Sequence, residues 1–273
     1  MNEAPVRCGV IGYPLAHTWS PELHRAFAEQ AGIALDYVVL SVEVADFEQA
    51  VREFFTQGGR GLNVTLPYKT SALALADEAG ALATRAGAAN VLTRLDDGRL
   101  RADNVDGAGF LCDLAHLEFD VRGAQVCVLG AGGAAAGVIC ALLEADIAGI
   151  TVINRHAQRA QALVERLNDD RLHVATPEQN TVPFSLIVNA TSASLTGECP
   201  NFLDTTVGSD TLAYDLVYAK KPTSFMQRTA EQGAHTSDGW GMLVEQAAES
   251  FQLWHGIRPD TSALHVRPTV KHS

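Results

Sequence analysis

The chain has 273 residues, of which 47% are hydrophobic and 19% are charged. This composition excludes a disordered or collagen-like chain and provides enough apolar material for two globular domains of ordinary size. The 32 acidic residues outnumber the 20 basic ones, and the net charge of -12 excludes a general affinity for nucleic acid or anionic membranes. An anionic ligand would therefore need a local basic pocket.

The cysteines and the first residues indicate a reducing compartment. Five cysteines are widely spaced and form no C-x-x-C pair, so we expect reduced thiols, and the nine scattered histidines predict no metal site. The start of the chain has no basic segment followed by a long apolar run, and no stretch approaches 18 uncharged apolar residues. We expect a cytoplasmic protein, either a monomer or a homodimer.

The first 105 residues alternate between short apolar strands and helical patterns. Strands are expected over VRCGVIGY, YVVLSV and GLNVT, with helices over 21–31 and 46–56 between them. This alternation predicts an α/β domain with a mainly parallel sheet. Two further strands flank a turn at Asp96-Asp97-Gly98, because Gly98 can supply the positive φ of a tight hairpin. We expect this hairpin to form an antiparallel edge of the sheet.

From Asp106 the pattern starts again. A helix over DGAGFLCDLAHL precedes a buried strand, QVCVLG, then a helix to about Glu144 and a second strand, GITVIN. Later strands are expected over SLIVNAT and TLAYDLVY, and a helix over 222–232. The last helix, GMLVEQAAESFQLWHG, is amphipathic and has no strand after it, so we expect it to return to the first domain. The expected domains are 1–105, completed by 239–273, and 106–238.

A glycine-rich segment in the second domain fits the dinucleotide-binding pattern G-x-G-x-x-G/A. It follows a predicted strand and opens a predicted helix, which is the context that this pattern requires. Gly130 permits a tight turn, Gly132 lets a pyrophosphate approach the backbone, and the helix N-terminus offers free N–H groups. We therefore favour a dinucleotide site over an ordinary glycine-rich turn, with contacts from Gly130, Ala131, Gly132, Gly133 and Ala134.

The end of the second strand of this domain indicates which dinucleotide binds. An NAD site usually places an acidic residue there to bind the ribose 2′-hydroxyl, but here Asn154 and Arg155 occupy the position. Arg155, with Arg159 four residues further on, offers planar donors suited to a 2′-phosphate. The alternative is a solvated pair of arginines at a helix start. The sequence predicts NADP (NADPH) and not NAD.

Polar residues gather after the predicted strands of the first domain. They are His17-Thr18-Trp19-Ser20-Pro21, the segment from Asn63 to Lys69, and Asn90 with Asn104-Val105-Asp106-Gly107. Ligands of open α/β sheets bind beyond the carboxyl ends of the strands, so these residues are binding candidates. Each alone also suits a helix cap or a turn.

Taken together, these segments resemble the shikimate dehydrogenase family along nearly the whole chain. The resemblance lies in GVIGYPLAHTWSPELH, GLNVTLPYK, GAAN, NVDGAGF, GAGGAA, NR, NATS, YDLVY and DGWGMLVEQAA, in this order. It implies an N-terminal α/β substrate domain, a Rossmann NADP domain and a C-terminal helix that returns to the first. It also implies reversible reduction of 3-dehydroshikimate to shikimate, in aromatic amino-acid biosynthesis, by hydride transfer without nucleic-acid or membrane partners.

The resemblance also assigns roles to residues. Lys69 and Asp106 are similar to the family's catalytic pair, and an ammonium beside a carboxylate can exchange a proton with the reacting hydroxyl. Which of the two moves the proton stays open. Substrate contacts are implied for Thr18, Ser20, Asn63, Thr65, Asn90, Tyr218 and Gln246. Further cofactor contacts are implied for Asn189, Ala190, Thr191, Ser192, Gly239 and Met242.

The match departs from the family pattern around the expected pocket. Thr18-Trp19-Ser20 stands where Ser-Lys-Ser is usual, Ser194 replaces a glycine, and Trp240 replaces a smaller apolar residue. Val105 replaces a threonine, and we expect this to remove a hydroxyl that faces the substrate. Two alternatives therefore stay open: a paralogue acting on quinate or another shikimate-like acid, and a non-catalytic NADP-binding sensor. Lys69 and Asp106 argue against the sensor.

Overall fold

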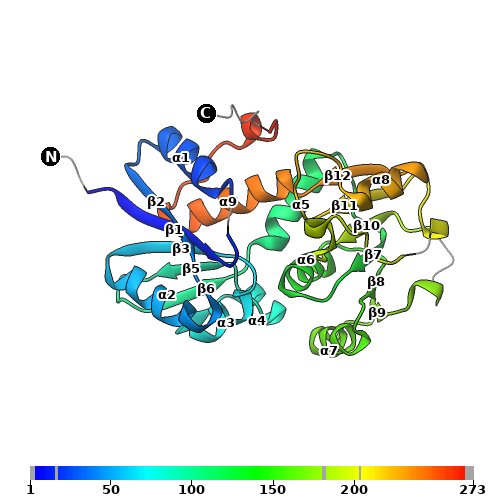
Figure 1. The fold of residues 1–273 in the computed structure, drawn as a ribbon, viewed down its shortest axis with the longest axis horizontal. Coiled ribbons are helices and arrows are strands. Elements are labelled where there is room, and N and C mark those ends of the chain that lie inside the picture. Colours follow the sequence, from blue (N-terminus) through cyan, green and yellow to red (C-terminus); the bar gives the residue numbers. More distant parts are fainter. Residues whose placement is uncertain (1–3, 16–17, 180–182, 203, 268–273) are drawn as a thin grey trace. The chain divides into compact units, whose positions relative to one another are not determined.

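The computed structural model describes residues 4–15, 18–179, 183–202 and 204–267, so His17 of the first polar segment lies outside the described residues. The chain divides into two compact units, one formed by 1–109 with 244–273 and the other by 110–243. Each unit has its own six-stranded sheet, and the elements are labelled in Figure 1. Within the described ranges, no helix combines the length and hydropathy needed to cross a bilayer.

The sheet of the first unit is mixed, with strand order β2-β1-β3-β5-β6-β4. Its strands are β1 (Val6–Gly12), β2 (Leu35–Ser41), β3 (Gly59–Val64), β4 (Glu78–Ala79), β5 (Val91–Arg94) and β6 (Leu100–Asp103). β1, β2 and β3 are parallel, and β5 runs antiparallel to both β3 and β6. The expected hairpin is confirmed, with Gly98 at φ 89°, but it is not the edge: β4 pairs with β6 outside it.

Helices cover both faces of this sheet, which gives the first unit three layers. The helices that lie wholly in this unit are α1 (Ser20–Ala31), α2 (Phe47–Thr56), α3 (Lys69–Leu75) and α4 (Ala81–Ala86). α2, α3 and α4 supply Phe54, Ala72 and Ala83 to one apolar core, together with Leu62 and Leu92 of the sheet. The amphipathic pattern expected for 46–56 is confirmed, after a short 3₁₀ turn at Val44–Asp46.

The last helix, α9 (Trp240–His255), belongs to the first unit from Val244 onward. Trp254 packs in a buried cluster with Cys8 and Val91 of the sheet, and Phe251 meets Phe27 of α1 edge-on at 5.8 Å. The returning helix is therefore part of the first unit's core.

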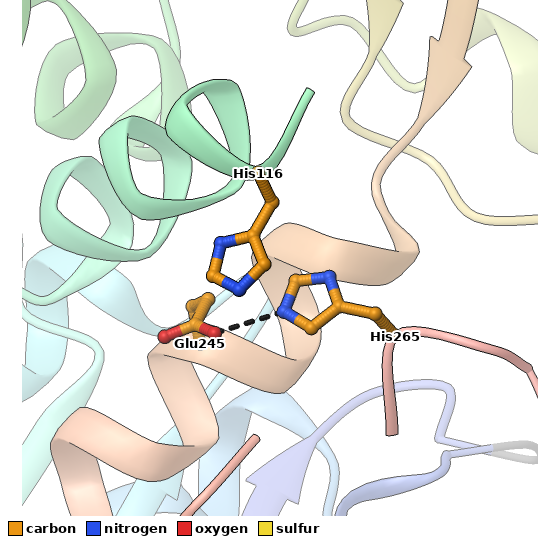
Figure 2. A group of neighbouring side chains, drawn as sticks. All are labelled: His116, Glu245 and His265. Carbon is orange, nitrogen blue, oxygen red and sulfur yellow. Dashed lines mark hydrogen bonds and ion pairs between the residues drawn. The ribbon is translucent and has the colours of Figure 1, made fainter. Parts of the chain in front are cut away.

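A buried carboxylate on α9 holds the segment that follows the helix. Glu245 is 1% exposed, and its side chain accepts a hydrogen bond from Arg258 at 2.5 Å and pairs with His265 at 2.9 Å. Figure 2 shows the contact between Glu245 and His265. These contacts hold residues 256–267 against α9, the helix that also contains Gln246.

The second unit has a fully parallel sheet with strand order β12-β11-β10-β7-β8-β9. Its strands are β7 (Gln125–Leu129), β8 (Gly149–Ile153), β9 (Leu172–Val174), β10 (Leu186–Asn189), β11 (Leu212–Asp215) and β12 (His235–Asp238). Around them lie α5 (Asp106–His116), α6 (Gly133–Glu144), α7 (Ala157–Leu167) and α8 (Ser224–Glu231). This is the doubly wound order, and its topological switch point lies between β7 and β10. The expected Rossmann fold is confirmed.

Candidate active site

The centre of the first unit's polar site is an ion pair between half-buried Lys69 and buried Asp106. Lys69 Nζ lies 2.6 Å from Asp106 Oδ2 and 2.9 Å from Oδ1, and the two side chains are 12% and 2% exposed. Lys69 opens α3 just after β3, and Asp106 opens α5 just after β6. Because β3 and β6 both run antiparallel to β5, their carboxyl ends lie at the same edge of the sheet. The fold thus brings together two residues 37 positions apart.

Asn90 links this ion pair to α9. Its Nδ2 donates to Asp106 Oδ1 at 2.9 Å and lies 3.3 Å from Gln246 Oε1, and its Oδ1 accepts the Val105 N–H at 2.8 Å. The expectation that Asn90 follows a strand is wrong, because it precedes β5. Since β5 is antiparallel to its neighbours, its first residue still lies at the edge where β3 and β6 end. Lys69, Asn90, Asp106 and Gln246 therefore form one hydrogen-bonded group.

Asn63 is held from two sides by residues that the sequence did not single out. Its Oδ1 accepts from the Tyr37 hydroxyl at 2.8 Å, and its Nδ2 donates to Ser250 Oγ at 2.7 Å. Ser250 in turn donates to the backbone oxygen of Gln246 at 2.9 Å. This series of hydrogen bonds fixes the amide of Asn63 relative to α9.

Thr18 and Ser20 form a hydroxyl pair before α1. Thr18 Oγ1 lies 3.1 Å from Ser20 Oγ and accepts the Ser20 N–H at 3.2 Å. Thr65 follows β3, where its backbone N–H donates to Ile11 of β1 at 2.9 Å. Ser20 is buried, whereas Thr18 and Thr65 are half-buried.

The side chain of Val105 lies in the apolar core. Its side chain is 6% exposed and belongs to the apolar cluster with Cys8, Val91 and Trp254. Its backbone N–H takes part in the polar group, through Asn90. Val105 therefore contributes its side chain to the core, and the expectation that it removes a hydroxyl from the pocket stays a prediction.

In the second unit, the glycine-rich loop lies at the switch point of the sheet. Gly130 follows β7 with φ 119°, and a Cβ there would lie 3.0 Å from the backbone oxygen of Ala190, which follows β10. Gly132 precedes the first turn of α6, and a Cβ on it would meet no atom within 4 Å. The helix N-terminus thus faces open space, which fits a bound pyrophosphate. Ala131, Gly133 and Ala134 complete this loop and the first turn of α6.

The residues after β8 fit a phosphorylated ribose. Asn154 shapes the turn, since its Nδ2 donates to the backbone oxygen of His156 at 2.8 Å. Arg155 precedes α7 and Arg159 lies in its first turn; both are exposed, and within the described part of the chain neither guanidinium forms an ion pair with a carboxylate. Both guanidinium groups are therefore available to a 2′-phosphate.

The loop after β10 is ordered by its own side chains. Asn189 Oδ1 accepts both the N–H of Thr191 at 3.1 Å and its hydroxyl at 2.7 Å. Ser194 Oγ accepts from Asn189 Nδ2 at 3.0 Å and donates to Asp215 Oδ2 at 2.6 Å. Ser192 lies exposed between them. Sequence reasoning missed Asp215, which lies within the YDLVY motif and is fully buried.

The remaining residues named from the sequence belong to the second unit. Tyr218 is half-buried and meets Trp240 edge-on at 6.3 Å. A Cβ on Gly239 would lie 2.2 Å from the backbone oxygen of Leu216, so glycine is required for this close approach. Met242 is 4% exposed on the first turns of α9.

Comparisons with known proteins agree with this geometry. Residues 10–92 match the shikimate dehydrogenase substrate binding domain, residues 113–196 match shikimate / quinate 5-dehydrogenase, and residues 239–265 match the shikimate 5'-dehydrogenase C-terminal domain. These three matches cover the Lys69 segment, the glycine-rich loop and α9.

Individual relatives are similar over nearly their whole length. A shikimate dehydrogenase (NADP(+)) of Cellvibrio japonicus is 44% identical over 254 residues, 92% of each chain. The crystal structure of an Ael1 enzyme from Pseudomonas putida superposes with a TM-score of 0.91 at 41% identity, covering 97% of this chain and 99% of the other. A shikimate 5-dehydrogenase from Thermus thermophilus, solved in complex with NADP(H) and shikimate, gives a TM-score of 0.86 at 34% identity, covering 95% and 97%. The chain belongs to the shikimate dehydrogenase family.

Proposed function

We propose that the protein is an NADP-dependent shikimate dehydrogenase, which interconverts shikimate and 3-dehydroshikimate in aromatic amino-acid biosynthesis. The Lys69–Asp106 ion pair, joined to Asn90 and Gln246, is the observation that carries this function. NADP(H) supplies or accepts the hydride. Among the relatives above, the Cellvibrio japonicus protein carries this activity in its name, and the Thermus thermophilus enzyme was solved with these ligands.

The first unit binds the substrate and moves the proton. Lys69 has three N–H donors, and Asp106 accepts at most two of them at the observed distances, so at least one remains for the reacting oxygen. Lys69 donates a proton to that oxygen in the reduction and takes it back in the oxidation, while Asp106 holds the ammonium in place. Asn90 and Gln246 orient a ring hydroxyl with their remaining polar atoms.

The other substrate contacts follow from the positions of their side chains. Thr18 and Ser20 offer two neighbouring hydroxyls to a carboxylate, and Asn63 and Thr65 offer an amide and a hydroxyl at the end of β3. Tyr218 is proposed as a further contact from the second unit. These assignments explain why the polar residues gather at one edge of the first sheet.

The second unit holds the cofactor with its own residues. Gly130 and Gly132 leave space at the N-terminus of α6 for the pyrophosphate, and Arg155 and Arg159 bind the 2′-phosphate that distinguishes NADP from NAD. Asn189, Ala190, Thr191 and Ser192 line the nicotinamide side, with Gly239 and Met242. No acidic residue stands beside Arg155 in the sequence to favour the free 2′-hydroxyl.

Lys69→Ala tests the catalytic assignment. Turnover of shikimate should fall by about 10² to 10⁴, the contribution of a general acid-base group. NADPH binding, measured by nucleotide fluorescence, should stay within about twofold, because the proposed cofactor residues belong to the other unit. Asp106→Asn should also slow turnover, since a neutral amide holds the ammonium less firmly.

The exposed Lys221 provides the matched control, and Lys221→Ala should leave turnover unchanged. Near-normal turnover of Lys69→Ala would remove Lys69 from the mechanism. If the wild-type protein turned over quinate but not shikimate, the assignment of shikimate as the substrate would be wrong.

A further inference from the structure

Three strands of the second sheet end in the same way. Asn189, Asp215 and Asp238 are the last residues of β10, β11 and β12, and they lie in register. Each accepts at Oδ1 the backbone N–H two residues further on, at 3.1, 3.0 and 3.1 Å. Such turns direct the chain out of the sheet at the edge where ligands of this fold bind.

Asp215 has a second set of contacts. It is fully buried, and its Oδ2 accepts hydrogen bonds from Ser194 Oγ at 2.6 Å and from Thr223 Oγ1 at 2.7 Å. Thr223 also caps α8 through the Met226 N–H at 3.2 Å. One carboxylate therefore joins the loop after β10 to the start of α8, and burial in a low-dielectric interior makes these charge-assisted bonds strong.

Ser194 completes the connection to the loop that lines the cofactor. Its hydroxyl accepts from Asn189 and donates to Asp215, so both ends of the segment 189–194 are fixed. Asn189 holds the N–H and hydroxyl of Thr191, and Thr191 Oγ1 accepts the N–H of Ala193 at 3.3 Å. Ser194 is not among the residues with positive φ, so the serine costs no backbone strain. A glycine at this position would have no hydroxyl to make this bond.

We infer that Ser194 is a positioning residue for the cofactor: by bonding Asp215 it holds the loop 190–194 in its binding conformation before NADP(H) arrives. The inference rests on the proposed function, in which this loop lines the nicotinamide. A protein whose binding-competent loop is already populated binds its ligand more tightly than one in which the loop must first be ordered. Ser194 would thus act on cofactor affinity and nicotinamide placement and not on shikimate binding.

Ser194→Ala tests the inference, because it removes only the hydroxyl. In the cofactor-free variant, hydrogen exchange at the amides of Thr191 and Ala193 should become faster. The Kd for NADPH, from a fluorescence titration, should rise about tenfold, the equilibrium consequence of losing one hydrogen bond to a charged group. The KM for shikimate should stay within about twofold, and the deuterium isotope effect on kcat with labelled NADPH should increase.

Matched variants separate positioning from general loosening of the loop. Thr196→Val removes another hydroxyl of the same 3₁₀ turn (Ala193–Thr196), one that bonds only within it, and it should behave like the wild type. Ser194→Thr keeps a hydroxyl and should restore most of the affinity. If Ser194→Ala does not fold, Ser194→Gly serves instead, since it removes the same hydroxyl.

Wild-type exchange and wild-type NADPH affinity in Ser194→Ala would overturn the inference, and so would an equal loss in Thr196→Val. If the unaltered protein itself did not bind NADPH, the proposed function would fail, whereas the exchange measurement would still report whether Ser194 orders the loop. The two failures are therefore distinguishable.

Discussion

The backbone N–H of Val105 belongs to the polar site, and the side chain of Val105 belongs to the apolar core. Its N–H bonds Asn90, while its methyl groups pack with Cys8, Val91 and Trp254. Valine and threonine have nearly the same volume, but a hydroxyl in this cluster would be buried among apolar groups. The side chain of Val105 therefore contributes to folding stability, whereas its backbone N–H helps to hold Asn90 in the polar site.

Val105→Thr should lower the free energy of unfolding by about 1 to 3 kcal/mol, the cost of burying a hydroxyl without an assured partner. The kcat/KM for shikimate should change by less than about twofold. Urea denaturation and steady-state kinetics measure the two quantities, and Val39→Thr on the exposed side of β2 is the control, with little expected effect. A severalfold gain in kcat/KM would place the hydroxyl in the substrate pocket and contradict the assignment.

The resemblance of the sequence motifs points to Lys69 and Asp106, and the structure brings their side chains to 2.6 Å from each other. The motifs do not reveal which way Val105 points, since one residue in a loop carries no periodicity. Tyr37 and Ser250 escape notice for a different reason. Tyr37 reaches Asn63 across 26 positions and Ser250 reaches it across 187, and only the folded sheet brings such residues together.

At the scale of elements, β3 and α9 approach closely because Gly61 has no side chain. A Cβ at Gly61 would lie 2.2 Å from the indole of Trp254, much closer than packed atoms tolerate. Gly61→Ala should therefore separate the returning helix from the sheet and lower the free energy of unfolding by about 1 to 3 kcal/mol, the usual cost of overpacking. Equilibrium unfolding in urea measures this loss.

A double-mutant cycle assigns that loss to the indole. Trp254→Leu makes room, so Gly61→Ala should cost less in its presence, by about 1 kcal/mol or more. Gly208→Ala is the control, because a Cβ there would meet its nearest atom only at 3.9 Å. Full additivity of Gly61→Ala and Trp254→Leu would show that another contact is responsible.

Elements with a strong apolar pattern could be predicted, and elements held mainly by backbone pairing could not. The Gly98 hairpin and the amphipathic α9 are examples of the first kind. β4 consists of Glu78 and Ala79 alone, and β12 reads His-Thr-Ser-Asp, so neither shows an alternation of apolar residues. β4 exists because its backbone pairs with β6, which is why the hairpin is not the edge of the sheet.

At the scale of the whole molecule, buried titratable groups decide how stability depends on pH. Burial lowers the pKa of His24 from 6.5 to about 3, and burial likewise lowers the pKa of His255. Burial alone would raise the pKa of Glu245, but hydrogen bonds from Thr261 and His265 and the charge of Arg258 bring it below its ordinary value. All three groups therefore make the fold less stable as the pH falls. The two histidines destabilise it at a higher pH than Glu245 does, because the pKa of a histidine in the unfolded chain is higher than that of a glutamate.

His24→Phe tests the largest of these contributions. The His24 ring stacks on Tyr37 at 4.5 Å and on Trp254 at 5.2 Å, and phenylalanine preserves an aromatic ring there without a group to titrate. Between pH 6.5 and 4.5 the unfolded chain protonates His24 and the folded chain does not, so the wild type should lose about 2 to 3 kcal/mol of stability from this residue. Urea denaturation at pH 7.0, 5.5 and 4.5 measures the free energy of unfolding. Between the highest and the lowest pH, His24→Phe should lose less of it than the wild type does, by that amount. His173→Gln, at an exposed histidine, should keep the wild-type dependence. An unchanged slope in His24→Phe would mean that His24 titrates normally in the fold, and that the acid sensitivity of the molecule originates elsewhere.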